Sequence, residues 1–148
     1  MLESFLRYVR YSYKRGPGYE LKHGDILEIN CKGWVHRELQ YRFGIILPHW
    51  LLSKELFEDD GIFVTSVKNI SEIRPGAIFL FGPHNLVDMK KLHVALYSGY
   101  QIAESNEPIL EHVNIIDKTV GFWPLEKFSQ EHRYEQLYAI KQPIKRVQ

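Results

Sequence analysis

The amino-acid sequence predicts an α+β domain in which helices precede and pack on an antiparallel β-sheet. Two observations lead to this class. Apolar residues recur at helical spacing in the N-terminal part, whereas from Ile62 onward short segments rich in β-branched and aromatic residues alternate with turn residues. Helices followed by strands are typical of α+β domains. A chain of 148 residues is normally one domain, so we expect residues 1–148 to share one core.

Three helices are expected before the strands. The first helix is expected to end before a Gly-Pro-Gly run and the second at Gly44, because glycine commonly ends helices. The second helix begins near Cys31 and carries an inward apolar stripe of Trp34, Val35 and Leu39. The three predicted helices are residues 2–14, 31–43 and 50–57.

Strands are expected where β-branched and aromatic residues cluster between turns. The predicted strands are Ile62–Val67, Ala77–Phe81, Leu92–Ser98, Gln101–Ser105, Val113–Ile116 and Gln136–Lys141. Gly99-Tyr100 is interpreted as the loop of a hairpin between the third and fourth of these. Phe122-Trp123-Pro124 is interpreted as an aromatic patch that covers the core, with one wall of a substrate groove as the alternative.

Composition excludes several classes of protein. The formal charge is +1, and 19 basic and 18 acidic residues are interspersed without a basic stripe, so we expect no nucleic-acid partner. The histidines show no metal-ligand spacing, so no metal site is expected. Charges interrupt the N-terminal apolar residues, and no apolar run is long enough to span a bilayer. We therefore expect a soluble protein without a Sec-type signal peptide, either cytoplasmic or exported by another route.

Cys31 is the only cysteine, so it cannot form an internal disulfide and its thiol is free to react. At the start of a helix, the thiol lies at the positive end of the helix dipole, which lowers a cysteine pKa. The sequence thus offers a nucleophile, and His93, in a predicted strand, offers its base. The alternative is an inert core cysteine and a histidine bonded only to backbone groups.

The predicted hairpin suggests how His93 is oriented. A two-residue loop at Gly99-Tyr100 would place His93 opposite Asn106 and Ala95 opposite Glu104, all on one face of the sheet. Either Glu104 or Asn106 then accepts a hydrogen bond from the imidazole N–H, as the third member of a cysteine triad does. A loop of odd length would reverse this parity. The alternative for Glu104 and Asn106 is that both are solvated residues near a strand end.

Three motifs in this order resemble the NlpC-type papain-like cysteine peptidases and their CHAP amidase relatives. They are Ile29-Asn30-Cys31-Lys32-Gly33-Trp34-Val35, Ile73-Arg74-Pro75-Gly76-Ala77 and Leu92-His93-Val94-Ala95-Leu96-Tyr97, and the resemblance covers about residues 19–141. It implies a papain-like fold and a hydrolase that cleaves an amide or peptide bond, with the peptide stem of peptidoglycan as the expected substrate. No cofactor is implied.

The resemblance also implies roles for individual residues. Cys31 is the nucleophile, His93 the general base and Glu104 the residue that orients it, with Asn106 as the other candidate because Glu104-Ser105-Asn106 resembles the Glu-x-Asn pair of CHAP domains. NlpC enzymes usually have a histidine at this third position. Tyr19 matches a tyrosine near the oxyanion, and the backbone N–H of Cys31 is a second oxyanion donor.

Two departures from the family pattern affect substrate recognition. Asn30 replaces the usual aspartate and Lys32 the usual serine, at positions that contact the amino end of the substrate in NlpC enzymes. The exact substrate is therefore left open.

Two other functions also remain: a non-catalytic binding or interaction domain on the same scaffold, and an acyltransferase that passes the acyl group to an amine instead of water.

Overall fold

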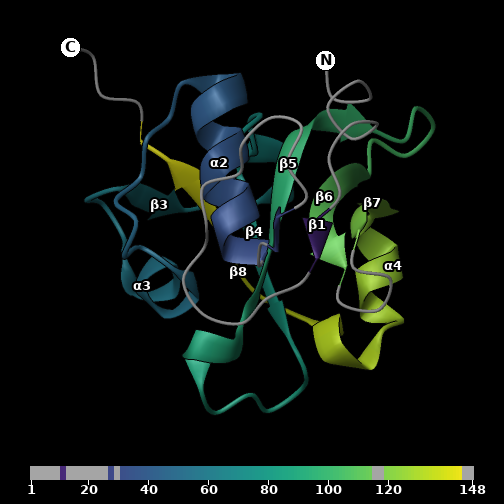
Figure 1. Cartoon of the computed structure of the whole chain (residues 1–148). Helices are drawn as coiled ribbons and strands as arrows, with labels where there is room; N and C mark the ends of the chain where they lie inside the picture. Colours follow the sequence, from purple (N-terminus) through teal and green to yellow (C-terminus); the bar gives the residue numbers. More distant parts are fainter. Residues whose placement is uncertain (1–10, 13–26, 29–30, 115–118, 145–148) are drawn as a thin grey trace.

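A computed structural model describes residues 11–12, 27–28, 31–114 and 119–144, and within them the chain is an α+β protein (Figure 1). A six-stranded antiparallel sheet has the order β3-β8-β4-β5-β6-β7. Its strands are β3 (Val64–Ser66), β4 (Ile78–Gly82), β5 (His93–Gln101), β6 (Pro108–Asn114), β7 (Thr119–Pro124) and β8 (Gln136–Pro143). The predicted class, helices with an antiparallel sheet, is confirmed.

Helices connect and cover the strands. The described helices are α2 (Cys31–Phe43), α3 (Ser53–Glu58) and α4 (Leu125–Ser129), with the 3₁₀ turns η1 (Ile70–Glu72), η2 (Met89–Lys91) and η3 (His132–Tyr134). The prediction for α2 is confirmed at both ends. Gly44 has a φ of +66° and its N–H donates to the carbonyl of Gln40 at 3.1 Å, which closes the last turn. The predicted short helix over 50–57 is α3, which begins at Ser53.

The predicted helix over residues 2–14 is wrong at its C-terminal end. Tyr11–Ser12 form the strand β1, which pairs in parallel with β2 (Leu27–Glu28) in a separate two-stranded sheet. The rest of the predicted helix lies outside the described residues. Helical spacing of apolar side chains reports a local preference, and pairing with a distant segment overrides it here.

The predicted hairpin at Gly99-Tyr100 is also wrong. Gly99 has a φ of +109°, but it lies inside β5, where the register with β6 shifts between Tyr97 and Gln101. The chain reverses at residues 102–107, closed by the bonds from Ile102 N–H to Glu107 O at 2.9 Å and from Asn106 N–H to Ile102 O at 2.8 Å. The glycine serves a β-bulge, so the predicted strand Gln101–Ser105 is a turn and β6 begins at Pro108.

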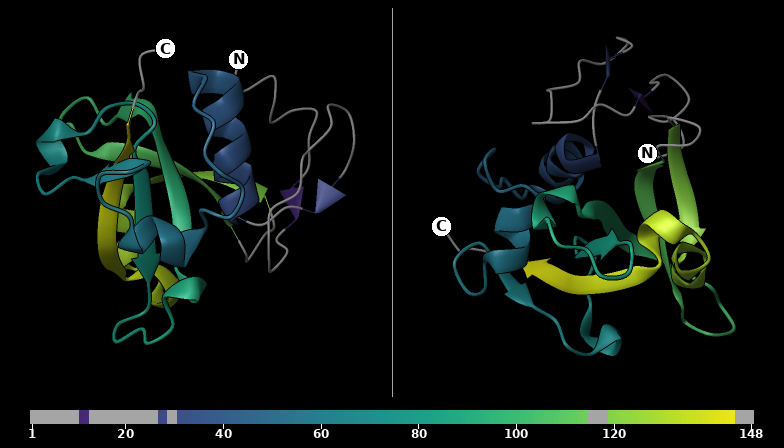
Figure 2. Two further views of the ribbon diagram at one scale, coloured as in Figure 1. Left: turned by 90° about the vertical axis from the view of Figure 1, so that its left-hand side faces the viewer. Right: turned by 90° about the horizontal axis from the view of Figure 1, so that it is seen from below.

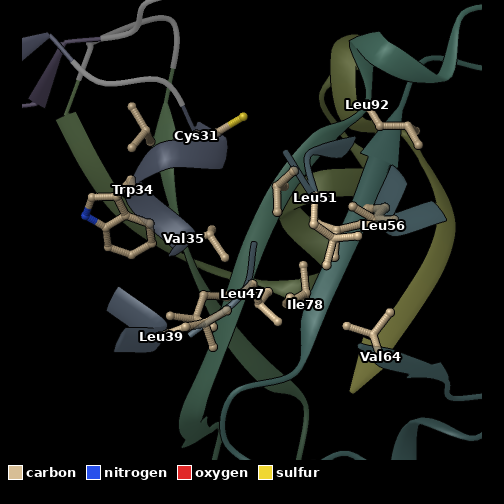
Figure 3. Packing of buried hydrophobic residues seen from close by; sticks show 14 residues of the cluster. Cys31, Trp34, Val35, Leu39, Leu47, Leu51, Leu56, Val64, Ile78 and Leu92 are labelled. Carbon is tan, nitrogen blue, oxygen red and sulfur yellow. The ribbon is translucent and has the colours of Figure 1, made fainter. Parts of the chain in front are cut away.

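The sheet is buried on both faces, and side chains of β5 alternate between them. Val94 and Leu96 pack with Trp34, Val35 and Leu39, which form the predicted inward stripe of α2 and are each fully buried. Figure 2 shows α2 lying against the sheet, and Figure 3 shows the side chains of this cluster. Ala95 and Tyr97 point the other way, into a second cluster built on Phe128 of α4, Tyr134 of η3 and Trp123 of β7.

A buried ion-pair network ties α2 to β6. Arg42 donates two hydrogen bonds to the carboxylate of Glu111, at 3.2 and 2.9 Å, and its Nε lies 3.0 Å from Glu38 Oε1. Both carboxyl groups are almost completely buried. Burial raises the pKa of Glu38 to about 7, and the nearby Glu111 carboxylate acts in the same direction. One arginine therefore serves two acids, one of which is half protonated near neutral pH.

Replacing Arg42 by methionine should destabilise the protein strongly. The change removes the cation that is paired with both buried acids, and removal of one partner from a buried ion pair costs about 3–5 kcal/mol. Urea unfolding followed by circular dichroism measures the loss. Lys54→Met is the matched control, because it removes the cation of an exposed i,i+4 pair with Glu58 and should cost less than about 1 kcal/mol. Equal losses in the two variants would contradict the role of Arg42.

Glu38 should make the protein less stable as pH rises. Its folded pKa of about 7 exceeds the ordinary value of 4.5, so the folded state binds the proton more tightly and its contribution is lost between these two pH values. We expect the free energy of unfolding of Glu38→Gln, relative to wild type, to increase from pH 4.5 to pH 7. Urea titrations across this range test this. A difference that does not change with pH would contradict it.

Candidate functional site

Cys31 begins α2, as predicted, but its thiol is buried with only 1% of the residue exposed. Burial raises the pKa of the thiol above its ordinary value, while a backbone hydrogen bond with Val94 and the charge of Lys32 act in the opposite direction. The expected lowering of this pKa at the helix terminus is therefore outweighed by desolvation. In the described arrangement Cys31 is a neutral thiol.

His93 is the first residue of β5 and is 94% buried, with 6% of its surface exposed. Its Nε2 lies 2.8 Å from Nδ1 of His112, on the neighbouring strand β6. Burial lowers the pKa of His93 well below its ordinary value, and His112 and Lys32 act in the same direction. The two rings are thus a hydrogen-bonded pair in which His93 stays neutral near pH 7.

The register explains why His112, and not the predicted residues, meets His93. Leu96 pairs with Glu111 and Tyr97 with Leu110, so extending the ladder puts His112 opposite Ala95. Ala95 has almost no side chain, which leaves room for the His112 ring to reach diagonally toward His93. Glu104 and Asn106 lie exposed in the turn after β5, and neither faces His93. Their predicted position opposite His93 and Ala95 fails with the hairpin register.

Aromatic rings enclose the histidine pair. The Tyr134 ring is stacked on His93, with centroids 4.2 Å apart and an interplanar angle of 25°. His112 contacts Trp123 at 4.4 Å and Phe128 at 4.8 Å between ring centroids. The segment Phe122-Trp123-Pro124 thus provides Trp123 as part of a buried wall around the pair.

Lys32 lies near both chemical groups. Its ammonium lowers the pKa of Cys31 and of His93, and its Nζ donates a hydrogen bond to the carbonyl of Lys90 in η2 at 2.8 Å. This bond joins the first turn of α2 to the segment just before β5. Tyr19 and Asn30, the other residues predicted to contact substrate, lie outside the described residues.

The structure brings Cys31 close to the start of β5 but separates it from His93. The thiol lies in the cluster that contains Val94, whereas the His93 ring stacks on Tyr134 on the opposite face. Among the described residues no hydrogen bond joins Cys31 to His93. His93 therefore has a partner at Nε2, while its Nδ1 makes no hydrogen bond within the described part of the chain.

His112 is the site residue that the sequence reasoning missed. The family pattern usually has a histidine at the third position of the triad, but the hairpin predicted at Gly99-Tyr100 led to Glu104 and Asn106 instead. Placing the turn later makes Pro108–Asn114 the partner strand of β5, and His112 is then a histidine facing the same side as His93. Period-two alternation along β6 was the available signal.

Comparisons with protein-family models, with curated proteins and with solved structures find no match. The described residues contain no group of three His, Cys, Asp or Glu side chains that could hold a metal ion. No helix among them has the length and apolar character needed to cross a membrane.

His93 should stabilise the protein more at neutral than at acidic pH. Its folded pKa lies below 6.5, so the unfolded chain binds the proton more tightly and the contribution of neutral His93 is lost as pH falls below 6.5. His93→Gln should therefore cost roughly 1–3 kcal/mol at about pH 7.5, because the hydrogen bond between His93 and His112 is lost, and less at about pH 5. Urea unfolding at the two pH values measures both costs.

His132→Gln is the control, because it changes an exposed histidine and should alter stability by less than about 0.5 kcal/mol. A cost of His93→Gln that is the same at both pH values would show that the ring is not kept neutral by burial.

Proposed function

We propose that this protein is a cysteine hydrolase of an amide or peptide bond, in which Cys31 is the nucleophile, His93 the general base and His112 the residue that orients it. The hydrogen-bonded pair His93–His112 carries the proposal. Two histidines on neighbouring strands supply the base and the third group that a cysteine triad needs, and Cys31 begins α2, which packs against the other face of β5. His112 takes the role first expected of Glu104 or Asn106.

The contact between Nε2 of His93 and Nδ1 of His112 is compatible with His93 as the base and His112 as the residue that orients it. With Nε2 of His93 donating to Nδ1 of His112, the lone pair of His93 is at Nδ1, the nitrogen that makes no hydrogen bond in the described part. When Nδ1 accepts a proton, the resulting imidazolium still donates from Nε2 to a neutral acceptor, and such a charge-assisted bond is stronger. In this tautomer, the bond to His112 leaves the lone pair of His93 at Nδ1, where a base requires it.

The proposed reaction has two steps. Nδ1 of His93 takes the thiol proton of Cys31, the sulfur attacks the carbonyl carbon of the substrate, and the protonated His93 gives its proton to the leaving amine. Water, deprotonated by His93, then hydrolyses the thioester and regenerates the thiol. The backbone N–H of Cys31 is a candidate oxyanion donor, because amides at a helix N-terminus have no intrahelical partner.

This reaction requires a movement of the first turn of α2. In the described arrangement β5 lies between the thiol and the His93 ring, and the thiol is neutral. His93 is the first residue of β5, so the thiol has to pass only the end of the strand. The bond from Lys32 to Lys90 O is the contact that such a movement would change.

The resemblance to NlpC-type and CHAP-type enzymes supports a papain-like fold and a substrate in the peptide stem of peptidoglycan. The exposed side of the site offers Lys32, a cation, where those families usually have serine. We therefore expect recognition of the substrate to differ from the common family pattern, while the reaction type is the same.

A non-catalytic binding or interaction domain is the second candidate. One observation favours it: the Cys31 thiol is buried on the face opposite His93, with its pKa raised. A thiol of this kind is a small apolar core residue with low reactivity.

Alkylation of Cys31 by iodoacetamide from pH 5 to pH 9 distinguishes the two candidates, since Cys31 is the only cysteine. A hydrolase should react readily near pH 6, and His93→Ala or His112→Ala should slow that reaction by on the order of 10-fold or more. His132→Gln, at an exposed histidine, should leave the rate unchanged. A rate that rises only above pH 8 and is the same in all variants would overturn the hydrolase and leave the binding domain.

A further inference from the structure

We infer that Tyr134 is a positioning residue that holds the imidazole of His93 in the plane needed for proton transfer. This inference rests on the proposed function. It concerns a side chain from η3, which comes after all the predicted site residues in the chain and belongs to none of the three motifs.

The hydrogen bond to His112 alone leaves one rotation of the His93 ring open. A single Nε2···Nδ1 contact sets the distance and direction between the two nitrogens, but the ring can still turn about that line. A neighbour that covers the flat face of the ring removes this freedom. Tyr134 is that neighbour, because its ring stacks on His93 at 4.2 Å with 25° between the planes. The direction of Nδ1 is thereby set.

Tyr134 is itself held rigidly. It is 4% exposed, its backbone N–H donates to the carbonyl of Glu131 at 2.9 Å, and its ring packs against Phe128 and Trp123 with centroids 6.0 Å away in each case. His112 touches the same ring edge-on at 5.8 Å. One tyrosine therefore contacts both members of the histidine pair and ties them to the α4–η3 segment.

Stacking and simple core filling make different predictions about His93. If Tyr134 only fills space, an apolar residue of similar volume should leave the environment of His93 unchanged. If the ring orients His93 and shields it from water, replacing it should loosen the imidazole, admit water and raise its titration midpoint toward 6.5. A change in protein stability alone does not separate these cases, so the readout must come from His93 itself.

The experiment compares Tyr134→Leu with Tyr134→Phe, and uses Tyr100→Leu, at an exposed tyrosine of β5, as the matched control. The pH titration of the His93 ring protons is followed by NMR, and the iodoacetamide rate of Cys31 is measured in the same proteins. We expect the His93 midpoint to rise in Tyr134→Leu only, and the alkylation rate near pH 6 to fall about 10- to 100-fold in that variant. Tyr134→Phe keeps the ring and should match wild type.

A folded Tyr134→Leu variant whose His93 titrates as in wild type would overturn the inference. If that variant does not fold, cross-relaxation between the Tyr134 and His93 rings in the wild-type protein decides: its presence supports the stacked geometry and its absence overturns it. A shifted His93 midpoint, combined with slow alkylation of wild-type Cys31 at every pH below 8, would mean that Tyr134 orients the ring but the hydrolase proposal fails.

Discussion

The alternation of side chains along β5 is the constraint on which the rest of the structure depends. Because a buried cluster lies on each face of the sheet, Val94 and Leu96 of this strand belong to one cluster and Ala95 and Tyr97 to the other. Val94 and Leu96 receive α2 and its thiol, whereas His93 and Ala95 face the aromatic wall. The same alternation in β6 places Glu111 against Arg42 and His112 against His93. Both the ion-pair network and the histidine pair follow from one register.

Two opposing effects act on Cys31, and their balance decides its chemistry. Position at a helix start and the nearby Lys32 favour the thiolate, while removal from water favours the neutral thiol. In the described arrangement the second effect is larger, because the thiol lies inside the core with Trp34 and Val35. Movement of the first turn of α2 toward solvent would reverse the balance without any change of residue.

The histidine pair is polar, yet it lies among the aromatic rings of Trp123, Phe128 and Tyr134. The hydrogen bond between the two histidines satisfies one nitrogen of each ring, which removes part of the penalty of burying them. The Tyr134 ring, stacked on His93, and the Trp123 ring, in a T-shaped contact with His112, then complete the packing. Within the described residues no carboxylate raises the pKa of His93, so no negative charge there would stabilise a protonated ring, and the pair is suited to staying neutral.

The sequence by itself determined the local elements: α2 from its apolar stripe and Gly44, and most strands from their β-branched and aromatic residues, together with Cys31 and His93 as candidate groups. Only the tertiary structure decided how they meet. Gly99 is equally suited to a turn or a bulge, and the choice of a bulge moved β6 along β5, so that His112 replaced Glu104 and Asn106 beside His93. Likewise, local residues favour a reactive thiol at Cys31, but its burial against Val94 comes from packing between segments about 60 residues apart in the chain.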